Sequence, residues 1–85
     1  MLLSQQIRAA RSLLGWDQNE LARQSKVGIT TIRRIEGTAG LIKSTTGTAW
    51  RLQQALEKAG IIFIDSDETA GPGVRLTTPW RDRVD

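Results

Sequence analysis

The segment that decides the fold is QNELARQSKVGITTIRRIEG, residues 18–37. Two stretches within it, 18–25 and 29–36, have helical patterning, and the turn 26–28 interrupts them. Two short helices joined by a three-residue turn must cross at a steep angle. Such a crossing needs a small residue where the helices touch, which Ala22 supplies. The spacing therefore predicts a helix-turn-helix.

Local signals mark where the two helices begin and end. Asp17 fits an N-cap, and Glu20 three residues later completes a capping-box pattern. Gly37 follows the second helix. The residues expected to hold the pair onto a preceding helix are apolar: Leu21, Val27, Ile32 and Ile35.

The flanking sequence predicts further elements. They are a helix over 4–14, a helix from about 44 to 59, and short strands over 61–65 and 74–77 joined by a polar turn. We divide the chain into a helix-turn-helix domain at 1–60, a β-hairpin at 61–78 and a frayed tail at 79–85. Trp16 and Trp50 are expected to be core or staple residues.

A longer pattern runs through the predicted helices. It reads Arg-x3-Gly-x2-Gln-x2-Leu-Ala from Arg11, then Val-x4-Ile-x2-Ile-Glu-Gly from Val27. This pattern resembles the Cro/repressor (Xre) helix-turn-helix family over roughly the first two-thirds of the chain. The resemblance implies an all-α, lambda-repressor-like bundle of four to five helices, here with a small C-terminal β-hairpin. It also implies binding of double-stranded operator DNA, usually as a two-fold dimer.

The resemblance assigns roles by position. Gln18, which opens the first helix of the pair, is expected at the phosphate backbone. The second helix is expected to enter the major groove, where an arginine can read guanine. Its DNA-facing residues are Gly28, Ile29, Thr30, Thr31, Arg33 and Arg34, and Lys43 is placed at a flanking phosphate. Arg11 and Glu36 match a buried structural ion pair.

Three positions depart from the family pattern. Lys26 stands where glycine is usual, Gly28 replaces a Ser or Thr helix cap, and Ile29 puts an apolar side chain at a leading readout position. These departures support an alternative function, in which the same fold binds another regulatory protein as an antiactivator or antitoxin-like module.

Composition limits the other classes of function. The 85 residues include no Cys and no His, which removes thiolate metal sites and the usual general base. We therefore expect no enzyme, no metal and no cofactor. Through Gly60 there are nine Lys or Arg and four Asp or Glu (+5), and afterwards three and five (−2), which gives the net +3. A basic front half suits a polyanionic partner.

The longest apolar run, residues 61–64, is too short to span a bilayer. We expect a cytoplasmic, nucleoid-associated protein with no membrane partner. A lone hairpin is marginal in water, so the hairpin is expected to support a homodimer, with edge pairing as one route. The dimerisation residues are Ile62, Ile64, Val74 and Leu76. In the alternative, the hairpin only covers the core of a monomer.

Overall fold

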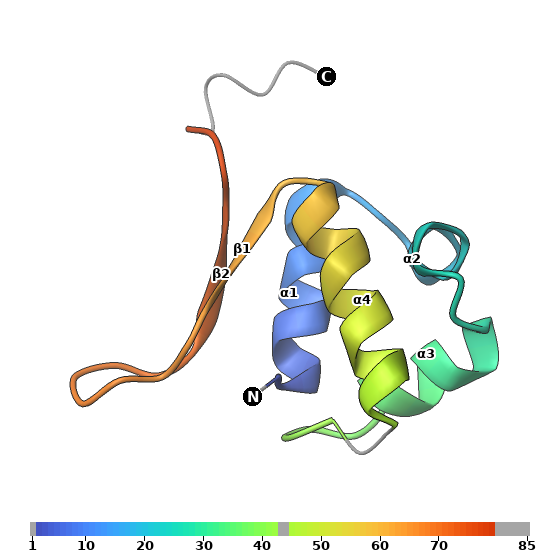
Figure 1. Ribbon diagram of the computed structural model, residues 1–85, viewed down its shortest axis with the longest axis horizontal. Helices are drawn as coiled ribbons and strands as arrows, with labels where there is room; N and C mark the ends of the chain where they lie inside the picture. The colour runs from blue at the N-terminus through green and yellow to red at the C-terminus, as the bar shows by residue number, and fades with distance from the viewer. Residues whose placement is uncertain (1, 43–44, 80–85) are drawn as a thin grey trace.

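The computed structural model describes residues 2–42 and 45–79. Four helices are followed by two strands, in the order α1 (Ser4–Leu14), α2 (Gln18–Ser25), α3 (Ile29–Glu36), α4 (Thr46–Lys58), β1 (Ile61–Ile64) and β2 (Gly73–Leu76). Figure 1 shows α1 and α4 side by side at the centre, with the hairpin on one flank and α2 and α3 on the other.

The helix ends follow from local chemistry. The Asp17 carboxylate accepts the Glu20 N–H at 2.8 Å, which caps the start of α2. The Thr45 hydroxyl accepts the Thr48 N–H at 3.2 Å and caps α4 in the same way. α1 ends at Gly15 in the left-handed conformation, φ 70°. These capped boundaries confirm the helices that the sequence predicted.

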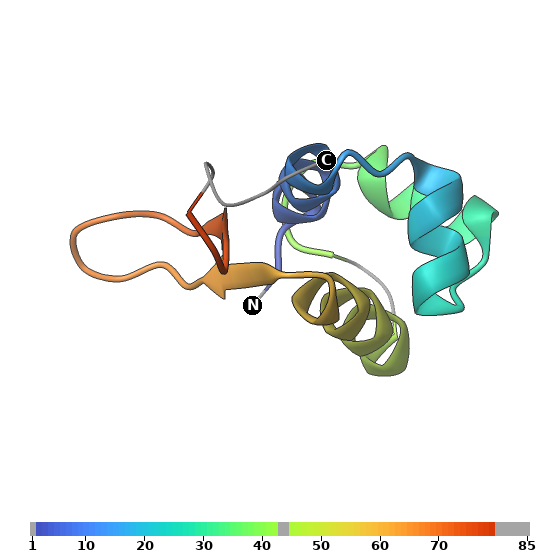
Figure 2. The ribbon, with the colours of Figure 1, turned by 90° about the horizontal axis from the view of Figure 1, so that it is seen from above.

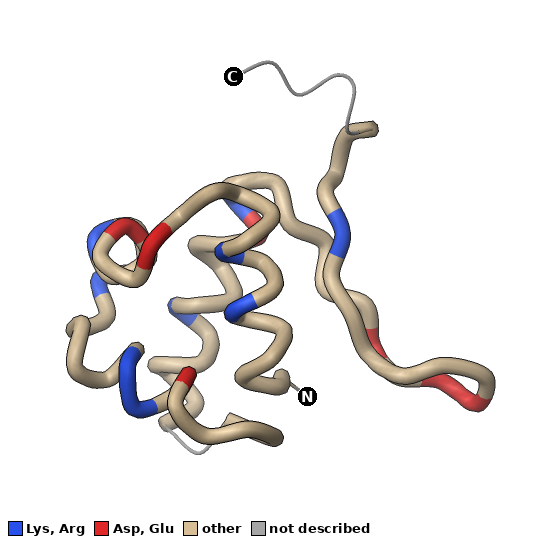
Figure 3. The backbone as a smooth tube through the Cα atoms, turned by 180° about the vertical axis from the view of Figure 1, so that it is seen from behind, with Lys and Arg blue, Asp and Glu red and all other residues tan. Residues whose placement is uncertain are grey.

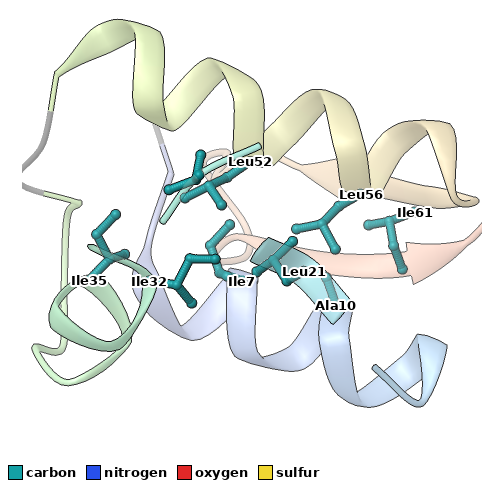
Figure 4. Close-up of a cluster of buried hydrophobic side chains, with 9 residues drawn as sticks. Ile7, Ala10, Leu21, Ile32, Ile35, Leu52, Leu56 and Ile61 are labelled. Atoms are coloured by element: carbon teal, nitrogen blue, oxygen red, sulfur yellow. The ribbon is translucent and has the colours of Figure 1, made fainter. Parts of the chain in front are cut away.

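A single apolar core joins all four helices to the first strand. Its buried residues are Ile7, Ala10, Leu21, Val27, Ile32, Ile35, Leu52, Leu56 and Ile61. Figure 4 shows these side chains converging from α1, α2, α3, α4 and β1. The helical spacing of the apolar residues places one stripe of each helix in this cluster.

The hairpin is antiparallel, with Ile61 opposite Leu76 and Phe63 opposite Val74. These four residues face inward, since Ile61 is buried and the other three pack against the core. The alternating residues Ile62 and Ile64 lie on the outer side, 42% and 40% exposed. Figure 2 shows the hairpin projecting from the end of the molecule formed by α1 and α4.

The expectation of an all-α bundle is wrong. The protein is a mixed structure, with four helices and a two-stranded antiparallel sheet in its described part. The β-branched and aromatic run at 61–64 favours an extended chain, and its inner residues complete the core that the helices leave open. A helix there would turn consecutive apolar side chains through 100° steps, so Ile61 and Phe63 would no longer face the same side.

One buried side chain joins the hairpin to α1. The Gln6 amide nitrogen donates to the Gly73 carbonyl at 3.0 Å and to the Ile64 carbonyl at 3.4 Å. Its amide oxygen accepts the Leu3 N–H at 2.9 Å. Gln6 is 4% exposed and therefore holds both strands to the start of α1 through a satisfied polar contact.

Candidate nucleic-acid interface

The outer face of α3 collects most of the residues predicted to contact DNA. Gly28, Thr30, Arg33 and Arg34 are exposed, and Ile29 and Thr31 are half-buried. The opposite face of the same helix is buried through Ile32 and Ile35. Arg33 and Arg34 are consecutive in the sequence, and Figure 3 shows a basic stretch of backbone on this helix. The packing thus leaves a polar and basic helix face open to a partner.

The turn before α3 has the unusual backbone that the sequence predicts. Lys26 ends α2 with φ 62°, a left-handed conformation that favours glycine. Gly28 occupies the N-cap of α3 and makes no side-chain cap. A Cβ at Gly28 would meet nothing within 4 Å, so packing does not require glycine at this position.

Lys26 itself is a candidate contact that the sequence reasoning overlooked. Its exposed side chain lies two residues before the N-cap of α3, at one end of the basic helix face. An ammonium at that place can contribute to a phosphate contact. The signal in the sequence is a basic residue at the tight turn before the second helix of the pair.

Gln18 contacts protein instead of pointing freely outward. Its side-chain N–H donates to the Glu36 carboxylate at 3.3 Å, and the residue is half-buried. The same carboxylate accepts the Arg11 Nε–H at 2.8 Å and the Nη2–H at 2.6 Å. Gln18 is thus joined to the predicted Arg11–Glu36 ion pair, which braces α1, α2 and α3 against one another.

The environment of Arg11 is consistent with a structural role. The Arg11 and Glu36 side chains are only 18% and 3% exposed. The hydrogen bond and charge of Glu36 raise the pKa of Arg11, whereas burial opposes this effect. Arg11 also donates to the Trp16 carbonyl at 2.9 Å, so its guanidinium makes its hydrogen bonds to groups inside the protein.

Two other basic residues of the front half have partners inside the protein. Arg8 donates to the Glu36 main-chain carbonyl. Arg23 pairs with Glu20, and this hydrogen bond, with one from Gln24, lowers the pKa of Glu20. Arg33 forms no ion pair with any described residue. Three of the arginines counted in the front half, Arg8, Arg11 and Arg23, are therefore engaged within the fold.

The remaining predicted site residues are dispersed. Lys43 lies outside the described residues. Of the four proposed dimerisation residues, Ile62 and Ile64 are on the outer side of the sheet, whereas Val74 and Leu76 pack inward. The four side chains therefore do not form one surface.

The two tryptophans predicted to be buried behave differently. Trp16 packs against the core. Trp50 is 61% exposed, so the prediction that it is a core residue is wrong. Leu52 and Leu56 define the buried side of α4, and the 100° helical step puts residue 50 on the other side. That spacing was visible in the sequence.

The acidic turn after β1 is organised by Asp67, which accepts hydrogen bonds from Thr69 and Ala70. No described group of His, Cys, Asp or Glu has the arrangement of a metal site. None of the described helices has the length and apolar character needed to cross a bilayer.

The chain matches no protein-family model, no curated protein and no solved structure. Membership of the Cro/repressor family therefore stays a prediction that rests on the residue pattern.

Proposed function

We propose that this protein is a sequence-specific DNA-binding transcriptional regulator, a dimeric repressor of a palindromic operator that acts at the nucleoid. The observation that carries the proposal is the division of α3 into two faces. Ile32 and Ile35 are buried, whereas Arg33 and Arg34 are exposed next to them on a helix that follows a three-residue turn.

The exposed side chains have the chemistry for both kinds of DNA contact. An arginine can donate two parallel hydrogen bonds to guanine O6 and N7, which discriminates by about 1–3 kcal/mol against a wrong base. Thr30 can reach a base edge or a phosphate, and Ile29 can pack on a thymine methyl group. Lys26 and Lys43 are suited to phosphate contacts, which position the protein without reading sequence.

The test is binding of the purified full chain to the DNA upstream of its own gene, at two salt concentrations. Arg33→Ala and Arg34→Ala together should abolish specific binding and leave only weak, salt-sensitive association. Arg75→Ala is the control for each single substitution, because it removes one positive charge from the outer side of the hairpin, opposite Ile62. Normal specific binding by the double variant would refute the assignment.

A second candidate function is binding of another regulatory protein through the same face. Ile29 favours it, because an apolar side chain stays half-exposed at the leading position of α3. In the same experiment, absence of DNA binding together with capture of a regulator that depends on Ile29 would support this alternative and exclude the repressor.

A further inference from the structure

Trp50 is the most exposed of the large hydrophobic residues in the described part of the chain, at 61%. It projects from the side of α4 opposite Leu52 and Leu56. An exposed indole leaves a large apolar surface in contact with water, which is unfavourable. Tryptophan is also among the residues that most often dominate the binding energy of interfaces. Trp50 is therefore a candidate contact residue for a partner.

A hollow of about 370 Å³ lies beside this ring. Three chain segments supply its apolar wall, through Leu2 before α1, Ala49 on α4 and Phe63 on β1. The rest of its lining is polar: Gln6, Thr46, Gln53 and Asp65. Trp50 itself forms part of the rim. A protruding indole and a hollow with one apolar wall thus lie next to each other on the same face.

Charges of opposite sign lie on the two sides of Trp50. Arg51 follows Trp50 on α4 and lies on the side of the ring that faces α2, near Gln24 and Ser25, whereas Asp65 lines the hollow just after β1. Both side chains are exposed, and neither forms an ion pair with a described residue. In an interface with two-fold symmetry, residue i meets residue j and residue j meets residue i. A second copy would therefore place each Arg51 against the Asp65 of its partner.

We propose that a second copy of this chain docks on the Trp50 face, which we define as Trp50, Arg51 and the hollow lined by Leu2, Ala49, Phe63 and Asp65. Each Trp50 enters the hollow of the partner beside the other Trp50, and two Arg51–Asp65 pairs flank the rings. This inference deepens the proposed function, because reading a palindrome requires two copies of α3. It also moves the dimer contact from the outer side of the hairpin to α4 and the inner side of β1.

The experiment is sedimentation equilibrium of the full chain without DNA. Trp50→Ala should weaken self-association by roughly thirtyfold, as expected for a hot-spot tryptophan. Arg51→Asp and Asp65→Arg should each weaken it, because each places like charges together twice. The double variant R51D/D65R should recover most of the wild-type association, since it restores two opposite-charge pairs. Only a contact between two copies of this chain predicts that recovery.

Ile62→Lys is the matched control on the outer side of the sheet, and it should leave self-association unchanged. The proposal is overturned by a monomeric wild type, by failure of the double charge exchange to recover association, or by loss of the dimer in Ile62→Lys alone. The last result would assign the interface to the outer hairpin face. Should Trp50→Ala fail to fold, the charge exchange still decides.

Self-association and DNA binding are measured separately, so the two proposals can fail independently. A dimer that binds no DNA would refute the repressor and leave the Trp50 face intact. Conversely, a monomer that binds an isolated half-site would support DNA recognition and refute the Trp50 face.

Discussion

The Glu36 carboxylate at the end of α3 is held by the Arg11 guanidinium of α1 through two hydrogen bonds, at 2.6 and 2.8 Å. Because Gln18 at the start of α2 donates to the same carboxylate, one acidic group sets the relative positions of three helices. The face proposed to read DNA therefore depends on a contact on the opposite side of α3.

Removing one member of this pair should be strongly destabilising. Arg11→Met leaves the Glu36 charge buried without its main partner, and we expect a loss of about 3–5 kcal/mol in the free energy of unfolding. Urea denaturation measures it. The double variant R11M/E36M should recover part of the loss, because no uncompensated charge remains. Arg23→Met, which breaks an exposed pair, should change stability little, and an equal effect of both single variants would contradict the buried role.

Gln6 should control how firmly the hairpin is attached. Gln6→Met keeps the length of the side chain but removes its hydrogen bonds to Gly73 and Ile64. Losing these buried contacts should cost about 1–3 kcal/mol. Hydrogen exchange should then accelerate at the hairpin amides more than at those of α2. The exposed Gln24→Met is the control, and hairpin protection equal to the wild type would show that Gln6 does not hold the strands.

Two helices, α1 and α2, end at a residue in the left-handed conformation, and substitutions at these two residues should have opposite effects on stability. Lys26 adopts φ 62° without being glycine, so Lys26→Gly should raise the free energy of unfolding by about 1 kcal/mol. At Gly15, φ 70°, the substitution Gly15→Ala should lower it by a similar amount. A Cβ at Gly15 meets nothing within 4 Å, so the lost stability comes from the backbone conformation and not from a steric clash. Thermal or urea unfolding measures both, and a change of the opposite sign at either position would contradict the assignment.

The hydrogen bonds that organise the turn after β1 should be lost at low pH. Hydrogen bonds from the Thr69 N–H and hydroxyl, and then from the Ala70 N–H, lower the pKa of Asp67 below its ordinary value of 3.8. Because the pKa is lower in the folded state, the stabilisation is fully present at pH values above the ordinary pKa of the carboxyl group. It is lost as the pH falls through the lower pKa of the folded state. An NMR titration of the Asp67 carboxyl should therefore show a midpoint below 3.8. Thr69→Ala removes one donor and should raise the midpoint, and a wild-type midpoint at or above 3.8 would exclude these bonds in solution.

Much of the helical part could be predicted from the chain because its signals are local. The Asp17 cap, the glycine after α1 and the spacing of Ile32 and Ile35 each act within a few residues. The pairing of Arg11 with Glu36 was accessible only through the resemblance to a family. Nothing in their spacing of 25 residues indicates contact.

The charge and the hairpin could not be predicted to the same extent. The count of charges in the front half includes Arg8, Arg11 and Arg23, but all three have partners inside the fold, and only the pairing of Arg11 was predicted. Likewise, the alternation in β1 indicated two faces without showing which one the helices cover. Both outcomes depend on contacts between residues far apart in the chain.

The sequence by itself therefore determined the four helices, the turn between α2 and α3, and the split of α3 into apolar and basic faces, because caps and periodicity are local properties. The tertiary structure alone decided that the sheet completes the core and that Gln6 holds both strands. It also leaves Trp50 exposed beside a hollow. Such relationships arise only when distant segments compete to bury the same apolar surface.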